Sequence, residues 1–323
     1  MSIKVLKPGM QTTIQDLGRY GWQSLGISVC GAMDQWAARI ANILLNNHED
    51  EAVLEMTFQG PTLAIEEDLI LAIFGADMNA SWNEKKLPQG KPIFAKKGDV
   101  LSFGYARDGV RAYLAVKNGF FLEKVLDSYS TDVKAKIGGL NGRPIKEGDI
   151  LPAKGMLPPL PPNQSFPYYI DNNYLDKNDS PIRFIRGRQY HWFSKESLQT
   201  FESSSFTIEP DSDRMGYRLS GPTLERKESK ELMTEGTTFG SIQIPPNGQP
   251  IILMADRQPT GGYPKIGEVI RSDLPRLSQM RPGSKLSFQE ISLQAAYQKT
   301  RKQLGDLEVI KKACHLKWNE IFK

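Results

Sequence analysis

Short apolar or alternating runs, each bounded by Gly, Pro, Asn or Asp, recur along most of this chain of 323 residues. Runs of about four to eight residues have the length of β-strands, and regular turn signals between them are typical of barrels and sandwiches rather than of alternating strand–helix units. Examples are Ala112–Val116, Ile182–Ile185, Ser241–Ile244 and Lys285–Phe288. We therefore expect a mainly β protein with few helices.

The two halves of the chain repeat each other in outline. In each half a glycine precedes an apolar run that ends in aspartate, first between Gly60 and Asp77 and again between Gly240 and Asp256. Each half then contains a similar strand-like segment, GDVLSF in the first and GSKLSF in the second. Duplication of a β unit accounts for the pattern, and chance similarity of short strand–turn segments is the alternative. We expect two related β-barrel halves.

A segment rich in Pro and Asn separates these halves. Proline fits neither a helix interior nor a central strand, so the segment is predicted to be loop or linker. The boundaries that follow are a first half at 1–155, a linker at 156–181, a second half at 182–290 and a helical tail at 291–323.

Three segments carry helical signals. Asp34 is placed to cap a helix that follows it, and Ser194 to cap a short helix through Phe201. In the tail, apolar residues at helical spacing predict one face packed on the body or on a partner. Those residues are Leu304, Leu307, Ile310, Cys314, Trp318 and Ile321.

Composition excludes several classes of function. The net charge is only +4, and Lys and Arg are scattered among acids, which argues against nucleic-acid binding. The two cysteines and three histidines lack metal-ligand spacing, so we expect no metal site. No apolar run reaches about 18 residues and no targeting signal is recognisable, which predicts a cytoplasmic protein without membrane contact.

The segment after the apolar run Pro250–Ala255 is the main candidate site. It places Asp256, Arg257 and Gln258 directly before the Gly-rich turn Thr260–Pro264. Glycines let the backbone turn tightly and let a ligand approach closely, and an acid, a base and an amide supply polar contacts. A tight turn with a surface ion pair is the alternative.

Two further polar clusters are candidates. Asp16 and Arg19 lie in a Gly-rich turn, and a site role and a structural ion pair are both open for them. The hydroxyls and carboxylate of Ser130–Asp132 suit either a polar lining for a small ligand or a turn stabilised by side chains. Arg214 offers a planar fork suited to a carboxylate.

Several longer motifs carry a resemblance to a known family. They are PGMQTTIQDLGRYG, VLEMTFQGP, GGLNGRPIKEGDIL, SDRMGYRLSG and DRQPTGGYPKIG. Together they resemble the biotin-dependent carboxyltransferase family, subdomains A and B, over roughly residues 5–290. That family includes the C subunit of bacterial 5-oxoprolinase (PxpC), the KipA regulator, and parts of allophanate hydrolase and urea carboxylase. The resemblance implies cyclophilin-like β-barrels. Two positions depart from the family pattern, since Tyr129 replaces an arginine and Arg188 a proline.

The resemblance implies an enzyme subunit. It points to the C subunit of a 5-oxoprolinase, a hydrolase complex with PxpA-like and PxpB-like (KipI-like) subunits that opens the lactam 5-oxo-L-proline to L-glutamate with ATP. The chain itself has no recognisable P-loop or dinucleotide motif, so we expect ATP to be bound in the complex. The alternatives are a KipA-like regulator that antagonises a KipI-type kinase inhibitor, and the carboxyltransferase part of a urea or amide carboxylase. The chain has no biotin-acceptor motif, so we expect no attached biotin.

Within that interpretation, the candidate residues take separate roles. Arg214 and Arg257 are expected to bind developing negative charge, with Asp256 orienting an arginine or acting as base. Further residues are expected to bind substrate, those of the first half lining an equivalent place or facing a partner subunit. They are Gln258, Thr260, Gly261, Tyr263, Asp16, Arg19, Ser130, Thr131 and Asp132.

Overall fold

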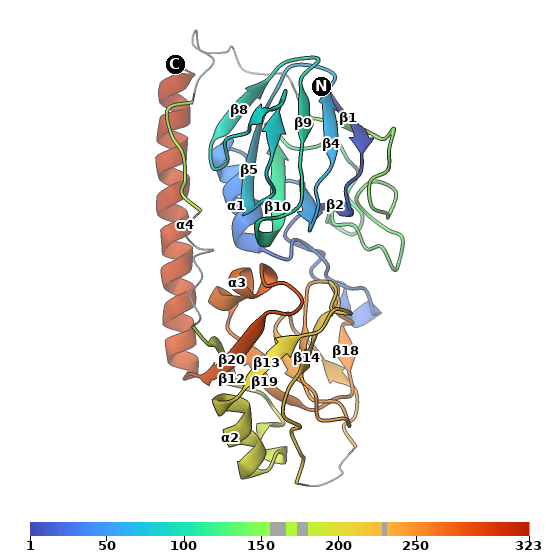
Figure 1. Ribbon diagram of the computed structural model, residues 1–323, viewed down its shortest axis with the longest axis vertical. Coiled ribbons are helices and arrows are strands. Elements are labelled where there is room, and N and C mark those ends of the chain that lie inside the picture. Colours follow the sequence, from blue (N-terminus) through green and yellow to red (C-terminus); the bar gives the residue numbers. More distant parts are fainter. Residues whose placement is uncertain (156–165, 173–179, 228–230, 323) are drawn as a thin grey trace. The chain divides into compact units, whose positions relative to one another are not determined.

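A computed structural model describes residues 1–155, 166–172, 180–227 and 231–322 (Figure 1). The chain divides into two compact units. The first unit comprises Met1–Arg19, Cys30–Leu175 and Gly305–Lys323, and the second comprises Tyr20–Val29 and Asp176–Leu304. Most of the linker expected at 156–181 lies outside the described residues.

The strands described in the first unit form two antiparallel sheets, where the sequence predicts a barrel. The six-stranded sheet has the order β11 (Ile150–Pro152), β1 (Ser2–Lys7), β4 (Thr62–Ile65), β9 (Val100–Ser102), β6 (Ser81–Trp82) and β7 (Lys85–Lys86). The five-stranded sheet has the order β2 (Gln11–Gln15), β3 (Val53–Thr57), β10 (Asp108–Val116), β5 (Leu69–Asp77) and β8 (Pro92–Ala95).

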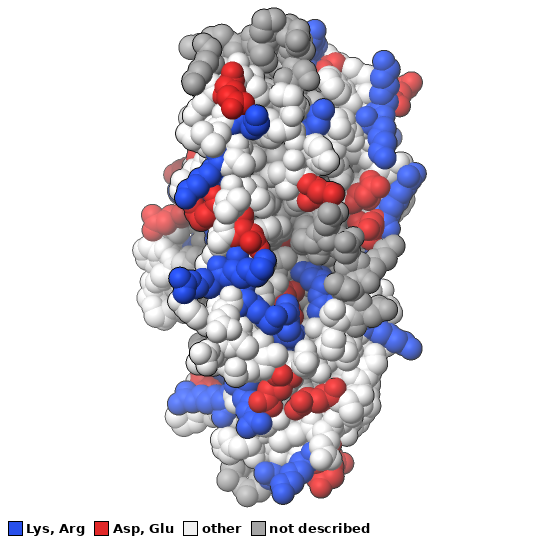
Figure 2. All heavy atoms as spheres, turned by 90° about the vertical axis from the view of Figure 1, so that its left-hand side faces the viewer, with Lys and Arg blue, Asp and Glu red and all other residues white. Residues whose placement is uncertain are grey.

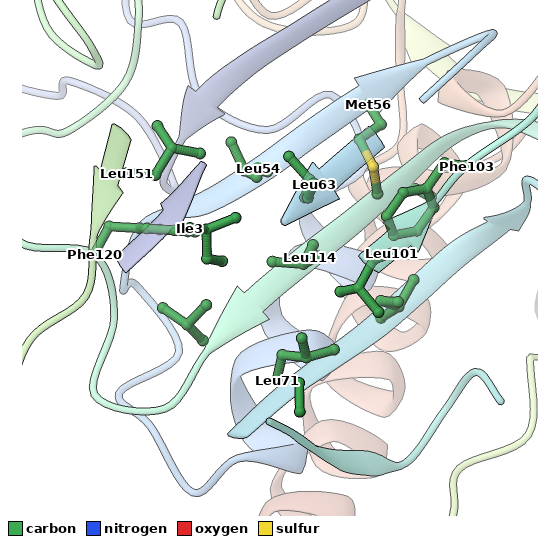
Figure 3. Packing of buried hydrophobic residues seen from close by; sticks show 14 of the residues in the cluster. Ile3, Leu54, Met56, Leu63, Leu71, Leu101, Phe103, Leu114, Phe120 and Leu151 are labelled. Atoms are coloured by element: carbon green, nitrogen blue, oxygen red, sulfur yellow. The ribbon is translucent and has the colours of Figure 1, made fainter. Parts of the chain in front are cut away.

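The main core of the first unit joins these two sheets (Figure 3). Leu54 and Leu114 enter it from the five-stranded sheet, and Ile3 and Leu63 enter it from the six-stranded sheet. Side chains alternate between the two faces of a strand, so Ile70, Ala72 and Phe74 of β5 belong to a second core that contains helix α1 (Gln35–Leu44). β5 is therefore buried on both faces, which explains its unbroken apolar sequence.

Helices complete the second core. The Asp34 carboxylate accepts a hydrogen bond of 3.0 Å from the Ala37 amide and caps α1, as predicted. The C-terminal helix α4 (Leu293–Ile321) contributes Leu307, Cys314 and Trp318 to the same core, so the predicted apolar face is largely confirmed. Leu304 is an exception, because 40% of it is exposed.

The second unit contains a closed barrel of seven strands. Their order is β12 (Ile182–Arg186), β19 (Lys265–Val269), β16 (Ser241–Gln243), β17 (Ile251–Leu253), β14 (Gly216–Ser220), β13 (Ser205–Ile208) and β20 (Lys285–Glu290). β12 pairs in parallel with β20 and closes the barrel. A mainly β fold with few helices, a barrel and a C-terminal helix is thus confirmed.

Aromatic side chains pack together in the core of the second unit. Phe184, on β12, meets Phe201 edge to face with ring centroids 5.1 Å apart, and Phe201 stacks on Phe288 at 4.3 Å. Phe201 comes from helix α2 (Lys195–Ser203), whose predicted cap is confirmed because the Ser194 hydroxyl accepts from the Ser197 amide at 3.0 Å.

Smaller elements complete the described structure. β15 (Glu235–Gly236) and β18 (Thr260–Gly261) form a separate two-stranded sheet in the second unit. The remaining helices are α3 (Leu274–Ser278) and three short 3₁₀ turns at Gln23–Leu25, Tyr190–Trp192 and Arg271–Asp273.

The face of the molecule in Figure 2 is neither mainly positive nor mainly negative, because Lys and Arg are interspersed there with Asp and Glu. Within the described part of the chain, no helix combines the length and the apolar content needed to cross a membrane.

Candidate functional site

A cavity of about 480 Å³ lies in the second unit. Its floor is the outer face of barrel strands β14, β16 and β17. In β14, Tyr217 and Leu219 are buried, and side chains alternate along a strand, so Gly216 and Arg218 face outward. The other residues of the floor are Gln243, Ile251 and Leu253.

The wall of this cavity is the segment that the sequence analysis singled out. Gln258, Thr260, Gly261 and Tyr263 all line it, together with Gly262. The strand before them, β17, ends at Leu253, so the chain has already left the barrel when it reaches Asp256. Thr237 holds the turn, because its amide donates to the Pro259 carbonyl at 2.9 Å and its hydroxyl to the Gln258 carbonyl at 2.5 Å.

Arg214 and Asp256 form a bidentate ion pair beside the cavity. Nε and Nη2 of Arg214 donate to Oδ2 and Oδ1 of Asp256, each at 2.8 Å, and the Asp256 amide donates to the Arg214 carbonyl at 2.8 Å. Neither side chain lines the cavity, but Asp213, Met215 and Gln258 next to them do. The pair therefore fixes two flanking segments of the site relative to each other.

Arg257 is buried and is not among the residues that line this cavity. The residue is 7% exposed, its Nη1 lies 3.4 Å from the carbonyl oxygens of Met254 and Ala255, and its guanidinium lies 5.9 Å from the ring centroid of Phe239. The catalytic roles expected for Asp256, Arg257 and Arg214 remain predictions, and the structure places all three outside the cavity lining.

A buried lysine attaches the two-stranded sheet to the barrel. Nζ of Lys265, on β19, lies 2.7 Å from the Gly236 carbonyl and 2.7 Å from Oε1 of Glu235. Burial raises the pKa of Glu235, but the hydrogen bonds from Lys265 and Gln189 outweigh this effect and leave it below its usual value. Arg188, one of the departures from the family pattern, is 80% exposed and adds only a 3.3 Å contact with Glu235.

The pKa of a carboxylate in the barrel itself, on β19, has the opposite shift. Burial raises the pKa of Glu268, although the hydroxyls of Thr238 and Ser241 donate to it and partly offset the rise. Strand pairing explains this cluster, since Ser241 lies directly opposite Glu268 in the ladder between β16 and β19.

Gln243 is one of several lining residues that the sequence did not predict. It is 5% exposed, and its Nε2 has no hydrogen-bond partner among the described residues. A Cβ at Gly261 would lie 2.7 Å from this nitrogen, so only glycine fits there without a shift. The signal in the sequence is an amide within an otherwise apolar segment, SIQIP.

The candidates of the first unit form a buried hydrogen-bond network. Asp16 accepts from the hydroxyls of Ser128 and Ser130 at 2.8 and 2.5 Å and from the Tyr129 amide at 2.6 Å. Arg19 is fully buried, and its Nη2 donates to the Ser130 carbonyl at 2.7 Å. These contacts tie a loop to the end of β2.

Thr131 and Asp132 extend this network. The Thr131 hydroxyl donates to the Ile14 carbonyl at 2.9 Å, and Asp132 accepts from the Ala135 amide at 2.8 Å. The five candidates Asp16, Arg19, Ser130, Thr131 and Asp132 are thus brought together, but in a different unit from the cavity. Their expected role in substrate binding remains a prediction.

Tyr129 occupies a position where the resemblance implies an arginine. The ammonium groups of Lys124 and Lys154 lie 4.9 and 4.8 Å from its ring centroid, and Lys154 also donates to the phenolic oxygen at 2.9 Å. Lys154 in turn pairs with Glu51 at 2.8 Å. The tyrosine ring therefore contacts cations here instead of supplying one.

No set of three or more His, Cys, Asp or Glu able to hold a metal is found in the described ranges.

Comparisons with known proteins agree with this architecture. The chain is 39% identical to the C subunit of 5-oxoprolinase from Haemophilus influenzae over 96% of its own length and 98% of that protein, and 39% identical to the C subunit of 5-oxoprolinase from Escherichia coli over 91% and 93%. The crystal structure of the K. lactis urea amidolyase superposes with a TM-score of 0.86 at 27% identity, covering 96% of this chain and 20% of that one. A family model for the carboxyltransferase domain, subdomains A and B, matches residues 25–290. The chain therefore belongs to the carboxyltransferase subdomain A and B family.

Proposed function

We propose that this chain is the C subunit of a 5-oxoprolinase complex, which opens 5-oxo-L-proline to L-glutamate with ATP. The observation that carries the proposal is the identity of 39% with two proteins named as this subunit, in one case over 98% of the relative's length. A match from end to end supports a shared role better than a match of one domain.

The cavity of the second unit is consistent with a small lactam. Its volume of about 480 Å³ lies in the range of small-molecule sites, which are mostly apolar with a few polar groups. Ile251, Leu253 and Met215 supply apolar surface, and Gln243 and Arg218 supply polar groups. We assign the ATP to the complex, because the sequence has no recognisable phosphate-binding loop.

Reconstitution tests the proposal. The chain is co-expressed with PxpA-like and PxpB-like subunits, and ATP-dependent glutamate formation from 5-oxo-L-proline is measured. We expect turnover by the full set and none by this chain alone or by the partners without it. Turnover by the isolated chain would contradict the proposal. Size-exclusion chromatography with light scattering measures whether this chain and the PxpB-like subunit elute together, as we expect.

The carboxyltransferase part of a urea carboxylase is a second candidate. The observation in its favour is the TM-score of 0.86 with the K. lactis urea amidolyase, across 96% of this chain. Such a role requires a partner that carries biotin, so urea-dependent turnover with a biotinylated partner and none with 5-oxo-L-proline would favour it. A stable complex with the PxpB-like subunit that turns over neither compound would favour a regulator.

A further inference from the structure

The Gln243 side chain is in an unusual state for a buried polar group. It is 5% exposed, it lines the cavity, and its Nε2 has no hydrogen-bond partner among the described residues. Buried polar groups are nearly always paired, because leaving one unpaired costs a large part of its hydration. An unpaired amide on a cavity floor is therefore expected to have a partner that comes from outside the chain.

The chain keeps this amide close to the cavity wall. Gly261 covers it, and any larger residue would place a Cβ 2.7 Å from Nε2. Gly261 belongs to β18, which pairs over only two residues with β15. Pairing with a ligand therefore requires a rotation of the amide that brings Nε2 from beside Gly261 to face the cavity, and the terminal torsion of a glutamine amide is broad enough for such a rotation.

The chemistry of a primary amide fits a lactam. A lactam ring holds its N–H and C=O on the same side, so the two groups can pair with the oxygen and nitrogen of one side-chain amide through two parallel hydrogen bonds. We propose that Gln243 is the residue that recognises the lactam amide in this cavity, an inference that rests on the proposed function.

The rest of the lining complements the other parts of such a ligand. Ile251 and Leu253 flank the floor and offer apolar contacts for ring methylenes. Arg218 also lines the cavity, and its ion pair with Asp211 at 3.1 Å is exposed, so its guanidinium can exchange this contact for the carboxylate of a ligand. Gln243 then discriminates the lactam from an open-chain or saturated analogue.

A matched pair of glutamine variants tests this role in the reconstituted complex. Gln243→Met keeps the approximate volume and removes the amide. We expect KM for 5-oxo-L-proline to rise about tenfold with kcat within about twofold, the effect of losing one good hydrogen-bonded contact to substrate. Gln289→Met, on an exposed strand position outside the cavity lining, is the control and should change neither constant. Gly261→Ala should reproduce the rise in KM, because its Cβ displaces the amide.

Competing ligands identify which group is recognised. 2-Pyrrolidone has the lactam but no carboxylate, and L-proline has the carboxylate but no lactam. We expect 2-pyrrolidone to inhibit the wild-type complex and to lose that inhibition with Gln243→Met, and L-proline to inhibit neither. Unchanged KM and unchanged inhibition by 2-pyrrolidone in Gln243→Met would overturn the inference, as would equal inhibition by L-proline.

Direct binding separates this inference from the proposed function. If the wild-type complex forms no glutamate, the proposed function has failed. NMR then measures the side-chain amide resonances of Gln243 in the full chain as 2-pyrrolidone is added. Gln243→Met lacks these resonances and therefore assigns them. A saturable shift of the assigned resonances supports the inference on its own, and no shift overturns it.

Discussion

The guanidinium of Arg214 meets the carboxylate of Asp256 edge to edge, with two hydrogen bonds of 2.8 Å. The arginine is on the segment that leads into β14, and the aspartate follows β17, so two stretches far apart in the sequence are joined beside the cavity. The Arg214 side chain is 5% exposed and that of Asp256 17%. Breaking such a pair from one side leaves the other charge poorly solvated.

The first prediction concerns the stability that this pair provides. Asp256→Asn should lower the free energy of unfolding by about 3 kcal/mol, because the guanidinium of Arg214 remains buried without its counter-charge. Urea denaturation measures the change. The control is Arg218→Met, which removes an ion pair whose side chains are 57% and 68% exposed and should change stability by less than about 1 kcal/mol. Equal effects of the two substitutions would contradict a structural role for the Arg214–Asp256 pair.

A second prediction addresses Arg257. If it stabilises transition-state charge, Arg257→Ala should reduce turnover by the complex about 10²-fold per folded molecule. The contacts of Nη1 with backbone carbonyls are an alternative use for the side chain, and their loss would lower the melting temperature instead. Turnover and thermal melting are therefore measured on one preparation, with Arg186→Ala on β12 as an exposed control. A lower melting temperature with full activity per folded molecule contradicts the catalytic role.

Local sequence signals predicted much of the fold. The capping side chains of Asp34 and Ser194 and the apolar face of the tail each depend on neighbours within a few positions, and the structure contains all three. The arrangement of the first unit as two sheets was not predictable from such local signals. Whether strands close into a barrel or split into two sheets depends on pairing between distant segments, such as that of β1 with β11.

The same distinction applies to the site. Gln258 and Tyr263 were predicted as lining residues because Gln258 lies just before the Gly-rich turn Thr260–Pro264 and Tyr263 lies on it, and a turn is a local feature. Gln243 was missed because its place beneath Gly261 depends on the packing of β18 over β16, which no local pattern records. For Asp16 and Arg19 the local pattern was not sufficient. A charged pair near glycines looks the same in the sequence whether it forms a ligand site or a buried hydrogen-bond network, and here it forms the network.

The third prediction is a pH dependence centred on Glu268. Burial raises the pKa of this carboxyl in the folded state above its value in the unfolded chain. Its contribution to stability is therefore fully present below the unfolded pKa of about 4.5 and is lost as the pH rises through the folded pKa. Glu268→Gln cannot ionise, so its stability relative to wild type should increase as the pH rises from about 4 to about 8.

Urea denaturation at several pH values measures this difference. The control is Glu308→Gln, at an exposed position of α4, for which the difference from wild type should stay nearly constant. Parallel stability curves for wild type and Glu268→Gln would show that the carboxyl does not bind an additional proton in the folded state.

The last prediction concerns the lysine that holds the cavity wall. Nζ of Lys265 contacts Glu235 and the Gly236 carbonyl, and these two residues are the whole of β15, which pairs with β18. Lys265→Met removes both contacts and leaves the Glu235 carboxylate without its ammonium partner, so we expect a loss of about 3 kcal/mol in unfolding free energy. Hydrogen exchange at Thr260 and Gly261 should accelerate more than exchange in the barrel strands, because the wall opens locally when its attachment is lost.

Lys285→Met, at an exposed position of β20, is the matched control and should leave exchange at both residues unchanged. If Lys265→Met accelerated exchange equally throughout the barrel, the lysine would be stabilising the whole unit rather than the wall. If it changed no exchange rate, the wall would be held by the hydrogen bonds of Thr237 to the Gln258 and Pro259 carbonyls instead.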